Sequence, residues 1–334
     1  MYTILAKTKF ACNRILYILF LIIIFYLSFN LYKLQSQSTY NIDSLQNILN
    51  SQTDDEDKIK TLIQFSQRTM QADPNGSLNF AEQLLEISSK IDNTPGVIKA
   101  YSLKSQVYRT IYSLDTALLF CDKAISLAES MNDKKSLADL HSQKGHIIFL
   151  SSGPRDGIIH YKSSYKLFEE LSDSMGMSNS LNGIGAMYMR LSKYDSAIYY
   201  FMKLVSISEE MGFEESLGKG YLNMGISYLE MKDYDNALYY FNNSIALNEK
   251  CKRLDFVSLA YNGLGNIARF KGQINDAISY FNDALKNAEA INDKKNEANI
   301  LNNIGNVYES TGKYNQTRII NFQSLIIVFV SRIN

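Results

Sequence analysis

Apolar residues recur along most of this chain at spacings of three and four positions, with short polar breaks between the apolar runs. Two consecutive segments, 181–191 and 194–211, show the pattern well. This is the period of an amphipathic α-helix, whereas a strand would alternate apolar and polar residues. The pattern predicts an all-α protein built of paired helices. Asp115, Asp195 and Asp235 stand where second helices begin, and we expect them to act as N-terminal caps.

The helix pairs repeat every 40 residues. A column of small residues stands at this spacing at Gly145, Gly185, Gly225, Gly265 and Gly305, with Ser105 in the same place one period earlier. Sixteen positions later comes an aromatic column that includes Phe201, Phe241 and Phe281. Two helices approach closely only where the contacting side chain is small, and a facing ring fills the remaining space. We therefore expect the glycine column to pack against the aromatic column within each unit.

This pattern resembles the tetratricopeptide repeat, and the motif is best kept in residues 181–201, 221–241 and 301–314. The family's usual unit is about 34 residues long, so the 40-residue period resembles the longer subtype of many bacterial regulators and of kinesin light chains. The resemblance implies a right-handed superhelical solenoid of about six helix hairpins plus a partial one. Two features depart from the family: the chain has no Trp, and the first unit has Phe65 where glycine is expected.

The chain divides into segments of different character. We expect a repeat domain at 58–316, with units at about 58–93, 97–132, 137–172, 177–212, 217–252 and 257–292 and a partial unit at 297–316. We interpret residues 35–57 as a linker or short helix. After Asn315 the repeat should continue with a small residue near Thr317 and an aromatic near Asn321, yet the sequence runs into the apolar stretch 325–330. This predicts an aberrant or truncated C-terminus at 317–334.

The segment Ile15–Phe29 is apolar and uncharged, and Lys7, Lys9 and Arg14 precede it. At about 1.5 Å per helical residue it is roughly 22 Å long, shorter than the ~30 Å hydrocarbon core of a bilayer. Residues 15–34 are therefore either a transmembrane anchor or a signal peptide, and the absence of an A-x-A cleavage site favours the anchor. The positive charges of the n-region at 1–14 keep it in the cytoplasm. We expect an inner-membrane protein with its repeats in the periplasm.

Charge and motif content exclude several classes of function. Lys and Arg together number 34, as do Asp and Glu, so the chain lacks the basic footprint of a nucleic-acid-binding protein. The only histidines are His141, His146 and His160, and we find no catalytic, metal-binding or phosphate-binding motif among the residues. The three cysteines suggest free thiols rather than a disulfide framework. We expect no enzyme, no cofactor, no metal and no nucleic-acid partner.

The family resemblance implies that the first helices line a concave groove, into which the positions three before, two before and one after the small residue point. Asparagine recurs at these positions, at Asn182, Asn223, Asn262, Asn266, Asn302, Asn303 and Asn306. A carboxamide both donates and accepts, so it can hold a peptide backbone whatever its side chains. Alternatively, Asn is simply common in this chain and some of these residues bond within the solenoid. Arg109, Arg190, Arg269 and Lys219 lie on neighbouring faces and can meet a carboxylate.

These observations predict a non-enzymatic, envelope-located module that binds a protein or peptide ligand. The alternative is the truncated input domain of a bacterial signal-transduction regulator, because an N-terminal membrane segment followed by 40-residue units resembles the sensory half of such proteins. In that case the kinase or DNA-binding output would be missing, since nothing in these 334 residues matches either.

Overall fold

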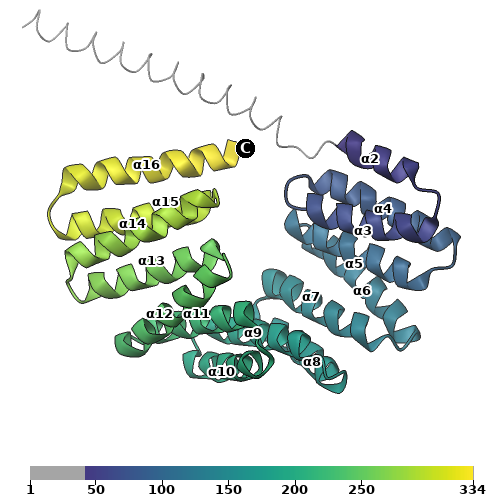
Figure 1. Ribbon diagram of the computed structural model, residues 1–334, viewed down its shortest axis with the longest axis horizontal. Helices are drawn as coiled ribbons and strands as arrows, with labels where there is room; N and C mark the ends of the chain where they lie inside the picture. The colour runs from purple at the N-terminus through teal and green to yellow at the C-terminus, as the bar shows by residue number, and fades with distance from the viewer. Residues whose placement is uncertain (1–41, 334) are drawn as a thin grey trace, which may run out of the picture.

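A computed structural model describes the backbone of residues 42–333 and the side chains of residues 45–329. The predicted n-region at 1–14, the predicted membrane segment at 15–34 and the first part of the linker lie outside the described residues. Within residues 42–333 all regular structure is helical (Figure 1). The helices are α2 (Ile42–Ser51), α3 (Asp55–Thr69), α4 (Pro74–Lys90), α5 (Thr94–Thr110), α6 (Leu114–Ser130), α7 (Lys134–Ser152), α8 (Pro154–Glu170), α9 (Ser174–Arg190), α10 (Tyr194–Met211), α11 (Glu214–Glu230), α12 (Tyr234–Lys250), α13 (Leu254–Phe270), α14 (Ile274–Ala290), α15 (Lys294–Ser310) and α16 (Tyr314–Ile333).

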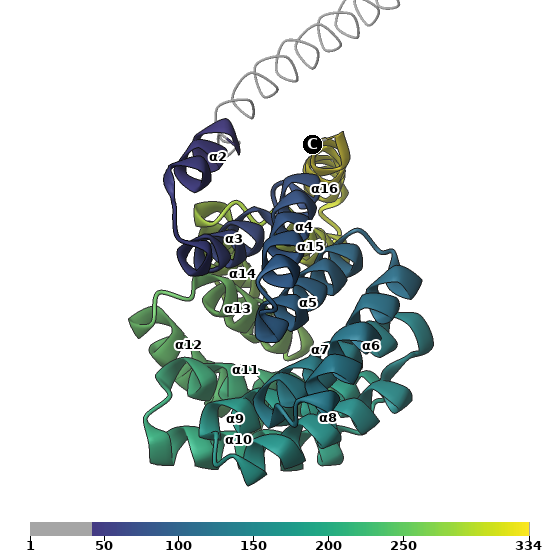
Figure 2. The ribbon, with the colours of Figure 1, turned by 90° about the vertical axis from the view of Figure 1, so that its right-hand side faces the viewer.

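From α3 onward the helices pack in consecutive pairs, and the pairs stack into a solenoid. The first helices of successive pairs, α3, α5, α7, α9, α11, α13 and α15, also touch one another, whereas the second helices of the described pairs lie further apart. The first helices therefore line the inner, concave side (Figure 1). The stack curves until α16 lies on the same side of the molecule as α2, as the two perpendicular views show (Figures 1 and 2).

Most helices end in a residue with left-handed backbone geometry, spaced about every 20 positions. Glycine takes this conformation at Gly212, Gly272 and Gly312, but Tyr112 and Lys232 also adopt it, with φ of 58° and 63°. An L-residue pays roughly 1–2 kcal/mol for this conformation, which is why Gly and Asn favour such sites. The sharp turns that result hold each helix against the next.

The helix starts differ from the sequence expectation. Asp115, Asp195 and Asp235 lie in the first turn of their helices rather than at the cap itself. In α12 the capping bond comes from Asp233, whose carboxylate accepts from the backbone N–H of Asn236 at 3.2 Å. A cap must stand just outside the helix to reach the free N–H groups. The first-turn aspartates still face the positive end of the helix dipole.

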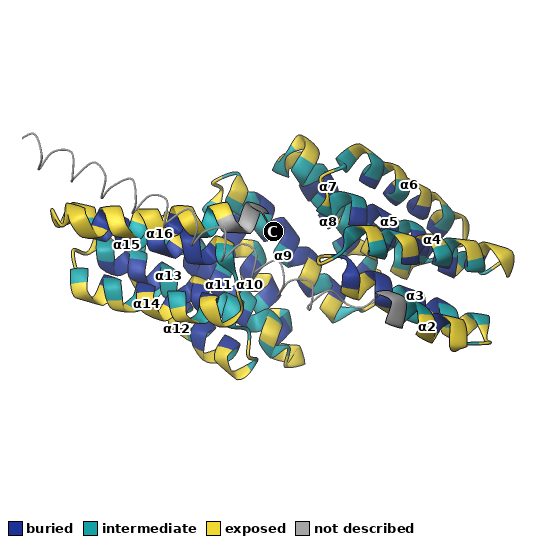
Figure 3. Cartoon of the chain, turned by 90° about the horizontal axis from the view of Figure 1, so that it is seen from above, coloured by how far each residue is buried: buried dark blue, intermediate teal, exposed yellow. Residues whose placement is uncertain are grey.

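The glycine column packs against the aromatic column as predicted. A Cβ added to Gly225 would lie 2.7 Å from Cδ1 of Phe241, and one added to Gly265 would lie 2.6 Å from Cε1 of Phe281. Both rings are fully buried. Figure 3 shows that buried residues follow the sides on which helices meet, while exposed residues follow the outside. In these units the glycine thus lets the two helices approach closely, and the facing aromatic ring fills the core between them.

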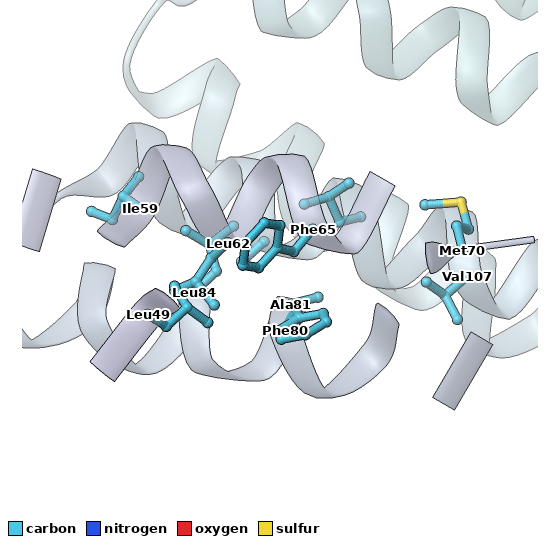
Figure 4. Close-up of a cluster of buried hydrophobic side chains, with 11 residues drawn as sticks. Leu49, Ile59, Leu62, Phe65, Met70, Phe80, Ala81, Leu84 and Val107 are labelled. Carbon is cyan, nitrogen blue, oxygen red and sulfur yellow. The ribbon is translucent and has the colours of Figure 1, made fainter. Parts of the chain in front are cut away.

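The N-terminal unit replaces the glycine differently. Ser66 rather than Phe65 occupies the small position, and its hydroxyl lies 3.0 Å from that of Ser77 across the helix contact. Phe65 instead joins a buried cluster and meets Phe80 edge to face, with ring centroids 5.6 Å apart (Figure 4). Leu49 of α2 packs into the same cluster (Figure 4). The helix α2 therefore covers the apolar side that the first unit would otherwise expose.

The C-terminal unit keeps its register, which differs from the sequence expectation. The helix α16 forms a second helix, so the last unit contains both of its helices. Thr317 is buried in the small column, and its hydroxyl approaches the carbonyl oxygen of Gly305 at 3.5 Å. Asn321 lies beside Gly305 where an aromatic ring stands in earlier units. The sequence pattern fades here because polar residues fill positions that aromatic residues fill elsewhere, although the helix geometry is unchanged.

Candidate functional site

Four of the seven predicted groove asparagines form two pairs that join neighbouring first helices. The side chain of Asn223 on α11 donates to Oδ1 of Asn182 on α9 at 2.8 Å. Asn303 on α15 donates in the same way to Oδ1 of Asn262 on α13 at 2.9 Å. All four are half-buried. In each pair one Nδ2 and one Oδ1 make no bond within the described protein.

The other three asparagines have different surroundings. Asn266 donates to the backbone carbonyl of Asn262 at 3.0 Å and accepts from Arg269 at 3.3 Å, so it is held within α13. Asn302 and Asn306 lie on α15 with exposed side chains. The structure thus brings the seven residues together as two inter-helix pairs, one intra-helix contact and two exposed amides. Whether they bind a ligand stays a prediction.

A third inter-helix amide contact lies between α5 and α7 and was missed because the sequence search considered only asparagine. Gln143 donates to the backbone carbonyl of Ser102 at 3.0 Å and accepts from the Ser102 hydroxyl at 3.0 Å. Gln143 stands in the same column as Asn223 and Asn303, 80 and 160 positions earlier. A search for any carboxamide in that column would have found it.

The contacts between first helices therefore alternate along the solenoid. Polar side-chain pairs join α5 to α7, α9 to α11 and α13 to α15. Between these contacts, ion pairs reach the residue before the next first helix: Lys135 of α7 pairs with Asp173, and Glu215 of α11 pairs with Arg253. The two ion pairs have opposite polarity. From α5 to α15, amide contacts and ion pairs thus alternate between successive first helices.

A pocket of about 530 Å³ lies on the concave side, between α5, α7 and α9. It is lined by Lys99, Ser102, Gln106, Arg109, Lys135, Asp139, Ser142, Gln143, His146, Tyr161, Phe168, Asp173, Met175, Gly176 and Asn179. Two aromatic rings form its apolar side, and the amide and hydroxyl groups are spread around them. A mixed lining with a few convergent polar groups is typical of ligand sites.

The charges in this pocket are only partly balanced. Lys135 pairs with Asp173. Asp139 has Lys135 and Lys99 nearby, and its burial raises its pKa above the ordinary value. Arg109 has no carboxylate partner within the described part of the chain; the groups that act on it electrostatically are tyrosines, and burial lowers its pKa. One guanidinium cation on the concave face is thus left without a counter-ion.

The remaining predicted basic residues have other surroundings. Lys219 lies over the ring of Phe256, 5.5 Å from its centroid, and burial lowers the pKa of its ammonium group. Arg269 stacks on Phe270, 4.5 Å from the ring centroid. Arg190 is exposed at the end of α9. The structure therefore does not gather the four cations into one site.

Family models agree with these repeated helix pairs. A tetratricopeptide repeat model matches residues 216–290 and 256–317, and a second tetratricopeptide repeat model matches residues 178–211. The chain contains tetratricopeptide repeats. No curated protein matches this tetratricopeptide repeat chain at a significant level.

Solved structures share the fold at low sequence identity. A signal-transduction ATPase with a tetratricopeptide repeat sensor from Pyrococcus horikoshii has a TM-score of 0.65 and 14% identity, over 91% of this chain and 48% of that one. A Rap protein complexed with competence and sporulation factor has a TM-score of 0.64 and 11% identity, over 87% and 80%. Aspartyl phosphate phosphatase F from Bacillus subtilis has a TM-score of 0.57 and 15% identity, over 88% and 89%. At such identities the likeness concerns the fold alone.

Reactive side chains in this tetratricopeptide repeat protein are dispersed or packed. His141 and His160 stack on each other with centroids 5.8 Å apart, and the described residues include no group of three metal-ligating side chains. Cys121 and Cys251 are free thiols, as predicted, and burial raises the pKa of Cys121 to about 12. A thiol with that pKa stays protonated at neutral pH and is a poor nucleophile. Among residues 42–333, no helix combines the length and apolar composition needed to cross a bilayer.

Proposed function

We propose that this tetratricopeptide repeat protein is a non-enzymatic interaction module that binds a peptide or an extended protein segment on its concave face. The observation that carries the proposal is two asparagine pairs between neighbouring first helices, Asn182 with Asn223 and Asn262 with Asn303. Each contact fixes two carboxamides in place and leaves one donor and one acceptor without a partner within the described residues. A peptide backbone offers one acceptor and one donor per residue, so it matches this arrangement regardless of sequence.

Preorganisation explains why the pairs favour binding. A free Asn side chain loses rotamer entropy when it holds a ligand, and ordering a side chain costs about 0.5–1.5 kcal/mol. The inter-helix bonds have already met part of that cost during folding. The pairs also recur along the concave face, so an extended ligand that follows the first helices meets them in turn.

The structural neighbours provide support of a weaker kind. The Rap protein of similar fold was solved in complex with competence and sporulation factor, and the Pyrococcus horikoshii protein carries its repeats as a sensor. The second of these also favours the alternative reading, in which this chain is the input domain of a regulator. That reading keeps the same binding face and adds an output that lies outside these 334 residues.

We further propose that the repeats lie outside the cytoplasm, anchored at the inner membrane. The support is the sequence: an uncharged apolar segment at 15–29 follows Lys7, Lys9 and Arg14. A reporter that is active only outside the cytoplasm, fused after Asp57, should be active. Activity of a cytoplasm-only reporter at the same point would overturn this location but would leave the binding proposal intact.

The binding proposal is tested with a labelled pool of random pentapeptides that are acetylated at the N-terminus and amidated at the C-terminus. Fluorescence anisotropy measures their binding to the full chain and to a variant with Asn223→Ala and Asn303→Ala. Each change removes one member of an inter-helix amide pair, and thermal melting checks that the variant keeps its fold. Loss of two backbone contacts of about 0.5–1.5 kcal/mol each should weaken binding roughly fivefold to a hundredfold.

The matched control changes Asn243 and Asn287 to Ala. Both are half-buried on second helices, where each donates only to a carbonyl of its own helix. This control should bind the pool as the unmodified chain does. If the pool does not bind the unmodified chain, or if both double variants bind it equally well, the concave amides are structural and the proposal is wrong.

A further inference from the structure

The helix α16 has apolar residues on two opposite sides. On its inner side Thr317 and Ser324 are buried against α15, and the Ser324 hydroxyl donates to the carbonyl oxygen of Ala298 at 3.0 Å. Ile320 and Ile327 pack against the same core. The other side, called the outer face below, carries large apolar residues that are between 39% and 64% exposed: Ile319, Phe322, Leu325, Ile326 and Phe329. Their spacing of three and four positions places them in one stripe along the helix.

This outer face differs from the surface of the preceding second helix. The residues 40 positions earlier, on α14, are Ser279, Asn282, Leu285, Lys286 and Glu289. Four of these five are polar, and all four are exposed even though α15 packs against α14. A further hairpin stacked on α16 in the same way would therefore leave most of the outer face in water. Exposed apolar patches mark sites of protein or membrane interaction, and this one does not fit another repeat of the stack.

The charges near the outer face have one sign. Residues 310–334 contain Lys313, Arg318 and Arg332 and no Asp or Glu. The helix α14, in contrast, contains three carboxylates. A helix with an apolar stripe and cationic residues is typical of helices that lie in the plane of a membrane interface. There the apolar side chains enter the acyl boundary, and the cations attract anionic lipid headgroups.

The position of α16 in the fold favours the same partner. In two perpendicular views α16 lies at the same edge of the molecule as α2 (Figures 1 and 2). The helix α2 begins at Ile42, and only residues 35–41 separate it from the predicted membrane segment at 15–34. These seven residues span at most about 25 Å even when fully extended. An anchor at 15–34 would therefore hold the edge that carries α2 and α16 near the bilayer.

We propose that the outer face of α16 lies on the membrane surface, with its apolar side chains at the boundary between lipid headgroups and acyl chains. This inference goes beyond the binding proposal and rests on the proposed membrane location. The helix lies along the surface rather than across the bilayer, because Thr317 and Ser324 keep its inner side on α15. Both ends of the curved stack are then held at the membrane, with α8 to α12 away from it (Figure 1).

The experiment uses a single introduced indole, because the chain contains no Trp. Leu325→Trp places the indole in the middle of the outer face. Tyr239→Trp is the matched control on α12, where Tyr239 is 60% exposed and Leu325 on α16 is 64% exposed. Both full-length variants are reconstituted into vesicles of equal parts phosphatidylcholine and phosphatidylglycerol. One set of vesicles has acyl chains brominated near the headgroup end, and the other set has no bromine.

Bromine quenches an indole only at close contact. Emission from Leu325→Trp should lie at shorter wavelength than emission from Tyr239→Trp, and brominated lipid should quench most of it. Emission from Tyr239→Trp should be the same in both sets of vesicles. Equal behaviour of the two variants overturns the proposal. A shift to shorter wavelength without quenching also overturns it, because another protein surface would then cover the outer face.

A second variant tests whether the apolar residues cause the contact. In the Leu325→Trp background, Ile326→Lys and Phe329→Glu copy the residues that α14 has at these positions, so the helix and its inner side should be kept. Thermal melting checks the fold. Quenching should be lost, and quenching that persists overturns the proposal. Flotation of the vesicles separates the two claims: a chain that floats without quenching refutes only the α16 contact, whereas a chain that does not float refutes the membrane location as well.

Discussion

Phe241 is held between two glycines on different helices, and this makes a strict test of the packing. A Cβ on Gly225 of α11 would lie 2.7 Å from Cδ1 of the ring, and a Cβ on Gly263 of α13 would lie 2.6 Å from its Cε2. Ordinary contacts begin at 3.4 Å, so the second Cβ would be about 0.8 Å too close. The ring cannot retreat, because Gly225 closes its other side.

The informative result is whether Gly263→Ala raises or lowers the free energy of unfolding. In an unobstructed helix interior the change would stabilise the protein by about 1 kcal/mol, since Ala is the better helix former. Overpacking of the ring should cost about 1–3 kcal/mol, so the expected net effect is no gain or a loss of up to about 2 kcal/mol. Replacing Phe241 by Leu shortens the side chain that obstructs the new methyl group. In that background Gly263→Ala should be neutral or stabilising.

Melting curves of the unmodified chain, both single variants and the double variant, followed by circular dichroism, give the coupling energy. We expect about 1–3 kcal/mol of favourable coupling between the two changes. Lys232→Ala, in an exposed turn, controls for unspecific effects and should change little. A rise in melting temperature for Gly263→Ala alone, with additive effects in the double variant, would refute the reasoning.

Two further predictions concern protonation and backbone geometry. Burial, and to a smaller extent Lys144, lowers the pKa of His141 and of His160 in the folded protein. The neutral rings therefore stabilise the fold fully above the unfolded pKa of about 6.5. This contribution is lost as the pH falls through the lowered pKa values of the folded state. A double change of His141 and His160 to Tyr, which copies the stacked tyrosines of later units, should therefore reduce the loss of unfolding free energy between about pH 7.5 and pH 5 in urea titrations; an unchanged loss would contradict the assignment. Tyr112→Gly should raise the unfolding free energy by about 1 kcal/mol, because φ at this exposed residue is 58°, and a lower melting temperature would count against the left-handed turn.

Side-chain volume explains how much of the fold could be predicted from sequence. Glycines and aromatic rings such as Gly225 and Phe241 contact each other within one unit, so a fixed spacing of 16 residues in the sequence records the contact directly. Where a polar residue fills the same space, as Asn321 does beside Gly305, the column is no longer visible although the geometry persists. The small residue of the first unit, Ser66, was missed for a related reason. It lies one position later than the 40-residue spacing predicts.

The concave face was harder to predict, because its contacts join different units. The asparagine pairs form between residues 41 positions apart, one more than the repeat, and this offset depends on how successive first helices are placed against each other. A column analysis considers each position alone and cannot show that Asn182 meets Asn223. The missing counter-ion of Arg109 is likewise a property of three helices together. Sequence could name this arginine as a candidate but could not show that it has no partner.

Because the inter-unit contacts alternate, they determine how many helix hairpins this protein can gain or lose at once. Removal of 80 residues, from 133 to 212, would bring α5 against α11 and place Asn223 where Gln143 now meets Ser102, so that a polar junction would be rebuilt and the Glu215–Arg253 pair would be kept. Removal of only 40 residues, from 173 to 212, would bring α7 against α11 and leave Lys135 opposite Phe213 instead of Asp173. Two hairpins, rather than one, are therefore the smallest module that can be gained or lost without mismatched joints.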